Sequence, residues 1–310
     1  MDARKRFREL LAAPEMTIVP GGFSPLHAVI AERAGFDLFF VAGSQVAAFV
    51  YGVPDIGVIG LRDMVDHARH VQARAGIPIL VDADTGYGNA INVYFAVTEF
   101  VRSGVAGIQI EDQEAPKKSG TSAGRRCVSA DEAVGKIRAA VAARNELDPD
   151  FVVVARCDSI GAEDEGFAEA VDRCVRYATE GGADVVWINS VESLDQLREV
   201  CARVPVPVMT IWGGPKPAPT FEQFSETGVK FVLYPVIAAS AALQASWQIL
   251  HDFAQRGQDA LKDWGDQVTQ APWGKAELAT LVGGGDRIAE LERELLPSEL
   301  QRNYGSTYGH

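Results

Sequence analysis

The sequence predicts an α/β protein, a (β/α)8 barrel of the TIM type followed by a C-terminal helical extension. Apolar runs that suit buried parallel strands alternate with helical stretches along most of the 310 residues. Doubly wound open sheets also alternate in this way, but they usually have fewer strands and a glycine-rich phosphate-binding turn after the first strand. Here that turn reads Pro20-Gly21-Gly22-Phe23-Ser24-Pro25, which lacks the fingerprint. The closed barrel is therefore the favoured architecture.

Each expected strand is a short apolar run between turn-like segments, as strands buried on both faces usually are. The eight runs are Met16–Val19, Leu38–Ala42, Ile77–Asp82, Gly107–Glu111, Phe151–Arg156, Asp184–Asn189, Val206–Ile211 and Phe231–Pro235. No strand pattern follows Ala241. We therefore expect a barrel domain, which carries any catalytic site, over residues 1–245 and a helical extension over residues 246–310.

Some helices have clear sequence signals. Ser129 precedes Asp131, Glu132 and an alanine-rich run, a pattern typical of a capped helix N-terminus. Residues 92–102 have helical spacing of apolar side chains, which predicts that the core-facing residues are Val93, Ala96, Val97, Phe100 and Val101. In the extension, a glycine-rich break at 282–286 precedes an apolar helical stripe, which we expect to pack on the barrel or on a neighbouring subunit.

The composition indicates an acidic protein with a large core. The net charge is −13, which argues against nucleic acid as a partner, because phosphate binding needs a basic face. A small anionic substrate stays compatible, since a cation and a few basic groups can bind it locally. Nothing resembles a signal peptide or a membrane span, so we expect a soluble cytoplasmic protein. The four cysteines form no CxxC pair, which predicts reduced, mostly buried thiols.

The segment Val81-Asp82-Ala83-Asp84-Thr85-Gly86-Tyr87-Gly88-Asn89 indicates a metal site. It ends the third expected strand, in which alternate side chains share a face, so Asp82 and Asp84 are expected to point the same way. Two such carboxylates repel each other and lose hydration, and a divalent cation relieves both costs. Oxygen ligands suit Mg²⁺ or Mn²⁺ better than zinc. A turn with capping aspartates is the alternative.

Polar residues also end other strands, at the face where barrels of this type have their sites. Buried polar groups are costly unless they have partners, so their accumulation at one end indicates a site. Arg156 is placed to bind a carboxylate or phosphonate in a bidentate manner. One hard cation is expected to be held by Asp55, Asp82, Asp84 and Glu111. The remaining polar strand ends are Ala42-Gly43-Ser44 and Asn189-Ser190.

A long loop, residues 113–126, follows the fourth expected strand, and we call it the lid loop. It is polar, punctuated by glycine and basic inside an acidic protein. Long loops in compact domains are often lids, and a basic lid could close on an anionic substrate and exclude water. A solvated surface loop is the alternative.

These segments resemble the isocitrate lyase / phosphoenolpyruvate mutase superfamily. The resemblance extends over roughly residues 5–250. It is carried, in this order, by Val53-Pro54-Asp55-Ile56-Gly57, Val81–Gly88, Gly107–Gln113, Lys117–Gly120 and Ala155–Asp158. It implies a Mg²⁺-dependent barrel with a gating loop, and C-terminal helices that are swapped between the subunits of a homo-oligomer, a dimer or a tetramer.

By position, the resemblance also implies a role for each candidate residue. Asp82 would bind the metal directly, and Lys117 would belong to the lid. The waters of the metal would be held by Asp55, Asp84 and Glu111. The substrate would be bound by Ala42, Gly43, Ser44, Arg156 and Asn189.

The chain departs from the lyases of this superfamily at several positions. Their lid has a cysteine that acts as an acid toward the enolate, and a histidine; here these are Ser119 and Thr121. Gln109 replaces a histidine and Asn189 a glutamate. A hydroxyl is a far weaker acid than a thiol, which disfavours retro-aldol cleavage and leaves decarboxylation easier to support. The candidate catalytic residues are Arg156, Lys117 and Ser119.

The leading hypothesis is a lyase or decarboxylase that acts on a small 2-oxo or 2-hydroxy dicarboxylate through an enolate. Such a substrate chelates a cation through two oxygens, so that charge is drawn onto oxygen as the adjacent bond breaks. Two alternatives stay open. One is C–P chemistry of the phosphoenolpyruvate mutase or phosphonopyruvate hydrolase type, and the other is a non-catalytic barrel that binds an acid.

Overall fold

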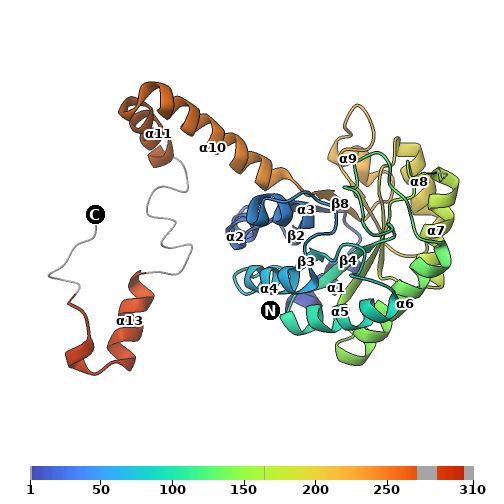
Figure 1. Cartoon of the computed structure of the whole chain (residues 1–310), viewed down its shortest axis with the longest axis horizontal. Helices are drawn as coiled ribbons and strands as arrows, with labels where there is room; N and C mark the ends of the chain where they lie inside the picture. Colours follow the sequence, from blue (N-terminus) through green and yellow to red (C-terminus); the bar gives the residue numbers. More distant parts are fainter. Residues whose placement is uncertain (1, 164, 271–284, 304–310) are drawn as a thin grey trace. The chain divides into compact units, whose positions relative to one another are not determined.

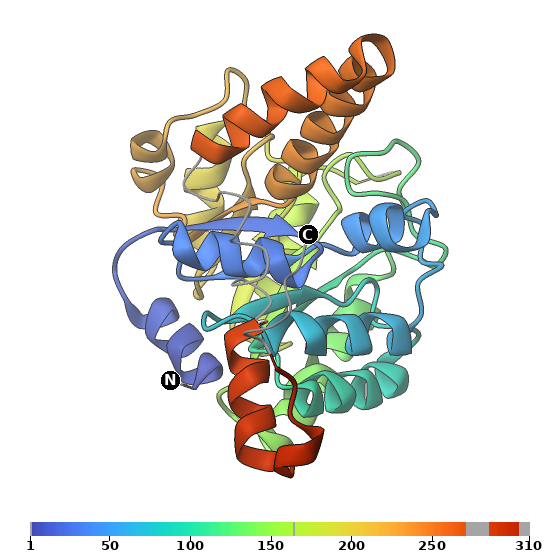
Figure 2. The ribbon, with the colours of Figure 1, turned by 90° about the vertical axis from the view of Figure 1, so that its left-hand side faces the viewer.

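The computed structural model describes residues 2–163, 165–270 and 285–303, and its eight parallel strands form one closed barrel. Each strand pairs with the next along the chain, and β8 (Phe231–Tyr234) pairs with β1 (Thr17–Gly22) to close the ring. Helices lie around the outside of the strands (Figures 1 and 2). The predicted barrel is confirmed, and the open sheet is excluded.

All eight strands overlap the predicted runs. The remaining six are β2 (Phe39–Val41), β3 (Ile79–Asp82), β4 (Gly107–Glu111), β5 (Val152–Cys157), β6 (Val185–Ile188) and β7 (Val208–Ile211). The helices of the barrel are α1 (Ala3–Ala12), α2 (Pro25–Arg33), α3 (Gly43–Val46), a π-helical turn (Ala47–Tyr51), α4 (Leu61–Gln72), α5 (Ala90–Ser103), α6 (Ala130–Leu147), α7 (Phe167–Thr179), α8 (Leu194–Arg203) and α9 (Phe221–Ser225).

The barrel interior is built in layers of four residues from alternate strands. The pairing register, followed around the ring, assigns each layer. A lower, apolar layer consists of Val19, Leu80, Val154 and Met209. The next contains Phe40, Gln109, Trp187 and Leu233. The two uppermost, which we call the mouth layers, are Gly21, Asp82, Arg156 and Ile211, and then Ala42, Glu111, Asn189 and Pro235. Polarity therefore rises toward the carboxyl ends of the strands.

The opposite end of the barrel is closed by α1. Its Phe7 side chain is fully buried and meets Phe231 edge to face, with ring centroids 6.0 Å apart. Leu10, one turn further on, belongs to the same apolar cluster. Because this end is packed with hydrocarbon, the mouth layers are where chemistry is expected.

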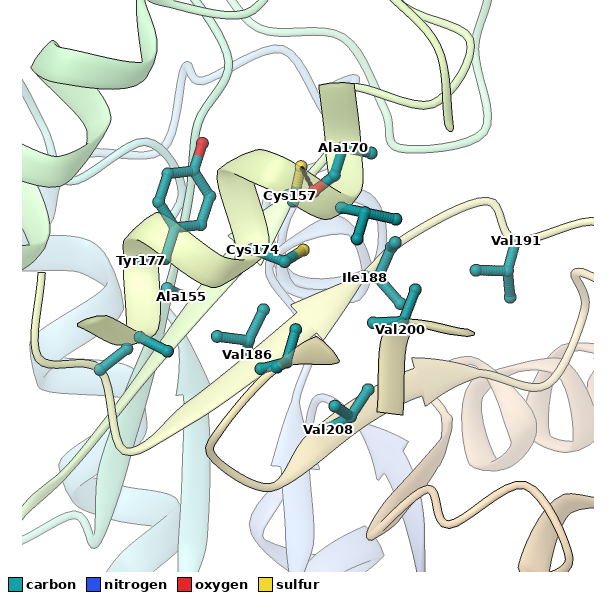
Figure 3. Packing of buried hydrophobic residues seen from close by; sticks show 14 of the residues in the cluster. Ala155, Cys157, Ala170, Cys174, Tyr177, Val186, Ile188, Val191, Val200 and Val208 are labelled. Atoms are coloured by element: carbon teal, nitrogen blue, oxygen red, sulfur yellow. Dashed lines mark hydrogen bonds between the residues drawn. The ribbon is translucent and has the colours of Figure 1, made fainter. Parts of the chain in front are cut away.

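The predicted signals for the helices at residues 129–132 and 92–102 are confirmed. The Ser129 hydroxyl accepts a hydrogen bond from the Glu132 backbone N–H at the start of α6, at 3.2 Å. Apolar side chains of α5 are buried as expected: Val93, Ala96, Val97, Phe100 and Val101. On the β5–β6 side, Cys157 and Cys174 lie among buried aliphatic side chains (Figure 3). All four cysteines are free thiols.

The chain divides into two compact units, Met1–Ala241 and Ala242–His310. The described part of the second unit is helical, with most of α10 (Ile237–Arg256), then α11 (Gln258–Gln270), α13 (Gly285–Leu295) and a 3₁₀ turn, Ser298–Leu300. Of the expected break at 282–286, residues 282–284 lie outside the described residues. No helix in the described ranges is long and apolar enough to cross a membrane. Helix swapping between subunits stays a prediction.

Candidate active site at the barrel mouth

The mouth layers bring acidic and basic side chains together because β3, β4 and β5 end next to each other. Asp82 is the last residue of β3 and Glu111 the last of β4, and Glu111 is in register with Arg156 of β5. All three side chains are buried. Buried charges persist only when they are paired, so the contacts among these groups decide what the site can do.

Asp82 is fixed by two backbone N–H groups. Its Oδ2 accepts a hydrogen bond from Gly43 at 3.1 Å, and its Oδ1 accepts one from Asp84 at 3.0 Å. A Cβ atom at Gly43 would lie 2.9 Å from Asp82 Oδ2, so the close approach of α3 requires glycine. Strand alternation does not explain the place of Asp84, contrary to our expectation. β3 ends at Asp82, and Asp84 has a left-handed φ of 54° in the following turn.

Lys117 of the lid loop is buried against the carboxylates. Its Nζ lies 2.8 Å from Asp55 Oδ1 and 3.5 Å from both Asp84 Oδ2 and Glu111 Oε1. Asp55 comes from the loop before α4, so three segments that are distant in sequence converge on one ammonium group. With Asp82 beside Asp84, the four predicted acidic residues lie at one site. The basic lid residue therefore points inward, whereas Lys118 next to it is exposed.

Burial and charge act against each other in this cluster. Burial raises the pKa of Glu111 well above its ordinary value, although Lys117 and Arg156 oppose the shift. The pKa of Asp84 is also raised by burial and is partly restored by Lys117. Burial alone would lower the pKa of Lys117, but Glu111 and the aspartates raise it above its ordinary value. The ammonium thus compensates carboxylates that burial disfavours.

Arg156 is held between two carboxylates and an aromatic ring. Its Nη1 lies 3.2 Å from Glu111 Oε2, and its Nε and Nη2 donate to Asp158 Oδ1 at 3.1 and 3.0 Å. The guanidinium carbon lies 4.4 Å from the centroid of the Trp187 ring. The predicted Arg156 therefore faces the mouth in a fixed orientation, in a layer that also contains Asp82.

Two polar partners of this network, Asp158 and Gln113, were not assigned a role from the sequence. Asp158 is fully buried and also accepts a hydrogen bond from Asn189 Nδ2 at 2.5 Å. Gln113 donates to Asp158 Oδ2 at 2.8 Å and to Glu111 Oε1 at 3.3 Å. The available signal was their position: Asp158 is two residues after Arg156, and Gln113 two residues after Glu111, just past a strand end.

The remaining candidate residues lie around the mouth. Ala42 and Asn189 belong to the uppermost layer, and the Gly43 N–H is already bonded to Asp82. Ser44 is half-buried, and its hydroxyl accepts a hydrogen bond from Gln45 Nε2 at 3.3 Å. Ser119 is half-buried in the lid loop, and its hydroxyl makes no hydrogen bond to any described part of the chain.

The donor set fits a hard divalent cation. All four acidic residues offer oxygen, and a cavity of about 10 Å³, room for one water-sized group, is lined in part by Asp55, Asp82 and Asp84. Glu111 Oε2 is buried and, besides its ion pair with Arg156, makes no hydrogen bond to the described residues. Among the described residues, no three His, Cys, Asp or Glu side chains are grouped so that they could hold a metal ion. A site with one direct carboxylate ligand and otherwise water ligands agrees with the oxygen donors that line the cavity and with the lack of three closely grouped ligands among the described residues.

Comparison with known proteins identifies the family. Residues 7–254 match the family described as Phosphoenolpyruvate phosphomutase. A 2-methylisocitrate lyase of Aeropyrum pernix is 37% identical over 292 residues, which cover 93% of this chain and 90% of that protein.

Two solved structures are similar over almost the whole length. A 2,3-dimethylmalate lyase, described as a PEP mutase/isocitrate lyase superfamily member, has a TM-score of 0.84 at 30% identity and covers 96% of this chain and 97% of its own. A phosphonopyruvate hydrolase in complex with oxalate and Mg²⁺ has a TM-score of 0.80 at 29% identity, with 96% and 100% covered. The chain therefore belongs to the phosphoenolpyruvate phosphomutase family, within the isocitrate lyase/PEP mutase superfamily.

Proposed function

We propose that this protein is a Mg²⁺-dependent carbon–carbon lyase or decarboxylase that acts on a small 2-oxo or 2-hydroxy dicarboxylate through an enolate. The broader part, a carbon–carbon lyase, is supported by relatives named 2-methylisocitrate lyase and 2,3-dimethylmalate lyase, and the second of these names also supports a dicarboxylate substrate. The proposed Mg²⁺ dependence and enolate chemistry rest on one observation. Next to Asp82, the carboxylates of Asp55, Asp84 and Glu111 converge on the buried ammonium group of Lys117.

In this proposal Asp82 holds Mg²⁺, or Mn²⁺, directly, and Asp55, Asp84 and Glu111 orient its water ligands. When bound, the ion would supply Lewis-acid stabilisation of the negative charge on the substrate oxygens that it contacts. Asp82 suits this role because two backbone N–H groups fix its carboxylate, and no lysine or arginine in the described ranges forms an ion pair with it.

The substrate carboxylates are assigned to the basic and polar groups of the mouth. Arg156 has N–H groups left after its bonds to Asp158 and its contact with Glu111, since a guanidinium has five. These can bind one carboxylate while the two protein carboxylates keep the guanidinium in place. Ala42, Gly43, Ser44 and Asn189 complete the rim around it.

The lid loop supplies closure and a candidate proton donor. With Lys117 inserted among the carboxylates, residues 117–120 cover the mouth, which excludes water from the reacting centre. The Ser119 hydroxyl has no hydrogen-bond partner in the part of the chain that the structure describes, and we assign it to protonation of the enolate carbon. Because a hydroxyl is a weak acid, decarboxylation is favoured over retro-aldol cleavage, since solvent can protonate the enolate once the lid loop has opened.

C–P bond cleavage is the second candidate, because the phosphonopyruvate hydrolase structure is similar over 96% of this chain. The two candidates release different products. Decarboxylation of oxaloacetate and cleavage of 2,3-dimethylmalate or 2-methylisocitrate yield pyruvate without phosphate, whereas phosphonopyruvate yields pyruvate and phosphate.

The test is a panel of these four acids with the Mg²⁺-loaded protein, with separate assays for pyruvate and inorganic phosphate. Turnover of at least one carboxylic acid is expected, and turnover of phosphonopyruvate alone would overturn the leading proposal in favour of C–P chemistry. Binding of the acids without turnover of any would leave the acid-binding barrel as the function.

We further propose a cytoplasmic homo-oligomer that exchanges C-terminal helices. The support lies in α10 itself, where Leu243, Trp247 and Leu250 each expose more than 60% of their surface. Exposed apolar residues at helical spacing are typical of a face that another helix covers. Sedimentation of the full chain, compared with a Trp247→Glu variant, tests the assembly.

A further inference from the structure

We infer that Asp158 is a positioning residue that couples closure of the lid loop to the orientation of Arg156. The inference deepens the proposed function and rests on it only where substrate is concerned, because the coupling itself is a property of the free protein. No role for Asp158 follows from the overall reaction, since its carboxylate lies behind Arg156 and is fully buried.

The Asp158 carboxylate is the centre of a hydrogen-bond network. Its Oδ1 accepts from Arg156 Nε at 3.1 Å, from Arg156 Nη2 at 3.0 Å and from Asn189 Nδ2 at 2.5 Å. Its Oδ2 accepts from Gln113 Nε2 at 2.8 Å. All of these donors point at one group, so the orientation of each depends on the negative charge at residue 158.

Two of these donors, Gln113 at the start of the lid loop and Asn189 after β6, also bind the segment 118–120 of that loop. Gln113 Oε1 accepts a hydrogen bond from the Lys118 backbone N–H at 3.0 Å. Asn189 Nδ2 donates to the Gly120 carbonyl at 3.0 Å as well as to Asp158. The segment 118–120 is therefore tied at both ends to side chains that Asp158 orients.

The lid loop also rests directly on Arg156. A Cβ atom at Gly120 would lie 2.0 Å from Arg156 Nη2 and 3.0 Å from Asn189 Nδ2. Only a glycine allows this approach, and it does so only while the guanidinium stays bonded to Asp158, with its central carbon 4.4 Å from the centroid of the Trp187 ring. A displaced Arg156 would collide with the closed lid, so arginine position and lid closure depend on each other.

The charge of Asp158 supports this role. Burial would raise its pKa, but Arg156, Gln113 and Asn189 lower the pKa below its ordinary value, so the group is an anion at neutral pH. An amide at this position would present an NH₂ group to at least one of the donors that now converge there. The network would then lose its common acceptor while the shape of the side chain stays almost the same.

The test compares Asp158→Asn with Asp184→Asn. Asp184 is the matched control, because it also binds two arginines, Arg8 at 2.6 Å and Arg144. It lies immediately before β6, at the opposite end of the barrel from the lid. In Asp158→Asn, trypsin should cleave the lid loop after Lys118 and Arg126 about tenfold faster than in the wild type, as loss of a hydrogen bond to a charged group predicts. KM for the turned-over acid should rise more than kcat falls.

The control defines the result that would overturn the inference. Asp184→Asn should lower the thermal stability while leaving lid cleavage and KM unchanged. If both variants change lid cleavage equally, or Asp158→Asn leaves it at the wild-type rate, Asp158 is merely a structural residue. Should Asp158→Asn fail to fold, Asn189→Ala, which removes one tie and keeps the Asp158 charge, must loosen the lid or the coupling is refuted.

A double variant tests whether Gly120 and Asp158 act on the same closure of the lid loop. Gly120→Ala pushes the lid off Arg156, so its effect on lid cleavage should be less than additive with that of Asp158→Asn. Full additivity contradicts the coupling. The lid-cleavage assay needs no substrate, so it is independent of the proposed function. If the wild type turns over none of the four acids but shows this coupling, the proposed function is refuted and the inference about Asp158 stands.

Discussion

Lys117 Nζ lies 2.8 Å from Asp55 Oδ1, which joins the lid loop to the loop before α4 across the barrel mouth. Both side chains are mostly buried, Lys117 at 4% and Asp55 at 18% exposure. A buried ion pair of this kind is costly to break from one side. Here, however, one partner is on the lid loop, which we propose opens into water, so we expect the pair to act on closure more than on folding.

This relationship predicts the effect of Lys117→Met. The lid amides should exchange hydrogen about tenfold faster or more, because the carboxylates lose the ammonium that holds residues 117–120 over them. Global unfolding should change by less than about 1 kcal/mol, since an open lid lets water hydrate Asp55 and Asp84. Hydrogen exchange by mass spectrometry and urea unfolding measure the two quantities. Lys118→Met, at the exposed neighbour, is the control and should change neither; unchanged lid exchange in Lys117→Met contradicts the assignment.

The lid serine predicts a change in reaction preference. Ser119→Cys provides a thiol, with a pKa near 8.5, where the wild type has a hydroxyl that is a far weaker acid. Cleavage of 2,3-dimethylmalate relative to decarboxylation of oxaloacetate should rise about tenfold or more, because retro-aldol cleavage gains most from an acid at the enolate carbon. Ser122→Cys, in the exposed part of the same loop, is the control. An unchanged ratio of the two rates in Ser119→Cys would remove Ser119 from the catalytic assignment.

Gln109 and Gln113 form a matched pair for stability. Both are buried. Neither side-chain amide atom of Gln109 has a hydrogen-bond partner among the described residues, whereas Gln113 bonds to Glu111, Asp158 and Lys118. Gln109→Leu should therefore be neutral or stabilise by about 1 kcal/mol, while Gln113→Leu should destabilise by about 1–3 kcal/mol. Urea unfolding gives both values. A loss above about 1 kcal/mol in Gln109→Leu would mean that the Gln109 amide has a partner in solution.

Burial of the thiols predicts a pH dependence. Burial raises the pKa of Cys201 to about 12, and it also raises the pKa values of Cys127 and Cys157. The thiolate is the reactive form, so the native thiols should react slowly with a disulfide reagent at pH 8 and rapidly once the protein is unfolded.

The raised pKa of Cys201 also makes the free energy of unfolding depend on pH. The contribution of Cys201 is fully present below the pKa of a free thiol, about 8.5, and is lost as the pH rises toward 12. The decrease in unfolding free energy between pH 8 and pH 10 should therefore be smaller in Cys201→Ala than in the wild type. Equal decreases would show that this thiol does not contribute.

The barrel was predictable because its strands have a local signature. Runs such as Gly107–Glu111 are apolar, short and separated by helical stretches, and this run matches β4 residue for residue. The main difference is β1, which continues to Gly22 through residues that read as a turn. Pairing with β2 extends this strand, with Gly21 opposite Phe40 and Gly22 opposite Val41, and no local pattern encodes such tertiary pairing.

The candidate site was predictable only in part. Asp82 and Glu111 end strands, and the carboxyl ends of barrel strands meet at one face, so their proximity followed from topology. Asp84 reaches the site through a left-handed turn, which strand alternation does not describe. The contacts of Lys117 and Asp158 depend on how the lid loop folds back over the mouth, and a loop without periodicity carries no sequence signal for that path.

The central claim is that Asp82 anchors a magnesium ion on which turnover depends. Its most direct test is pyruvate release from oxaloacetate by the wild type and by Asp82→Asn, with Mg²⁺ and with a chelator, corrected for the rate without protein. We predict Mg²⁺-dependent release by the wild type that falls at least about a hundredfold in Asp82→Asn, as loss of metal-assisted charge stabilisation requires. Turnover that survives the chelator, or is equal in the two proteins, would contradict the account.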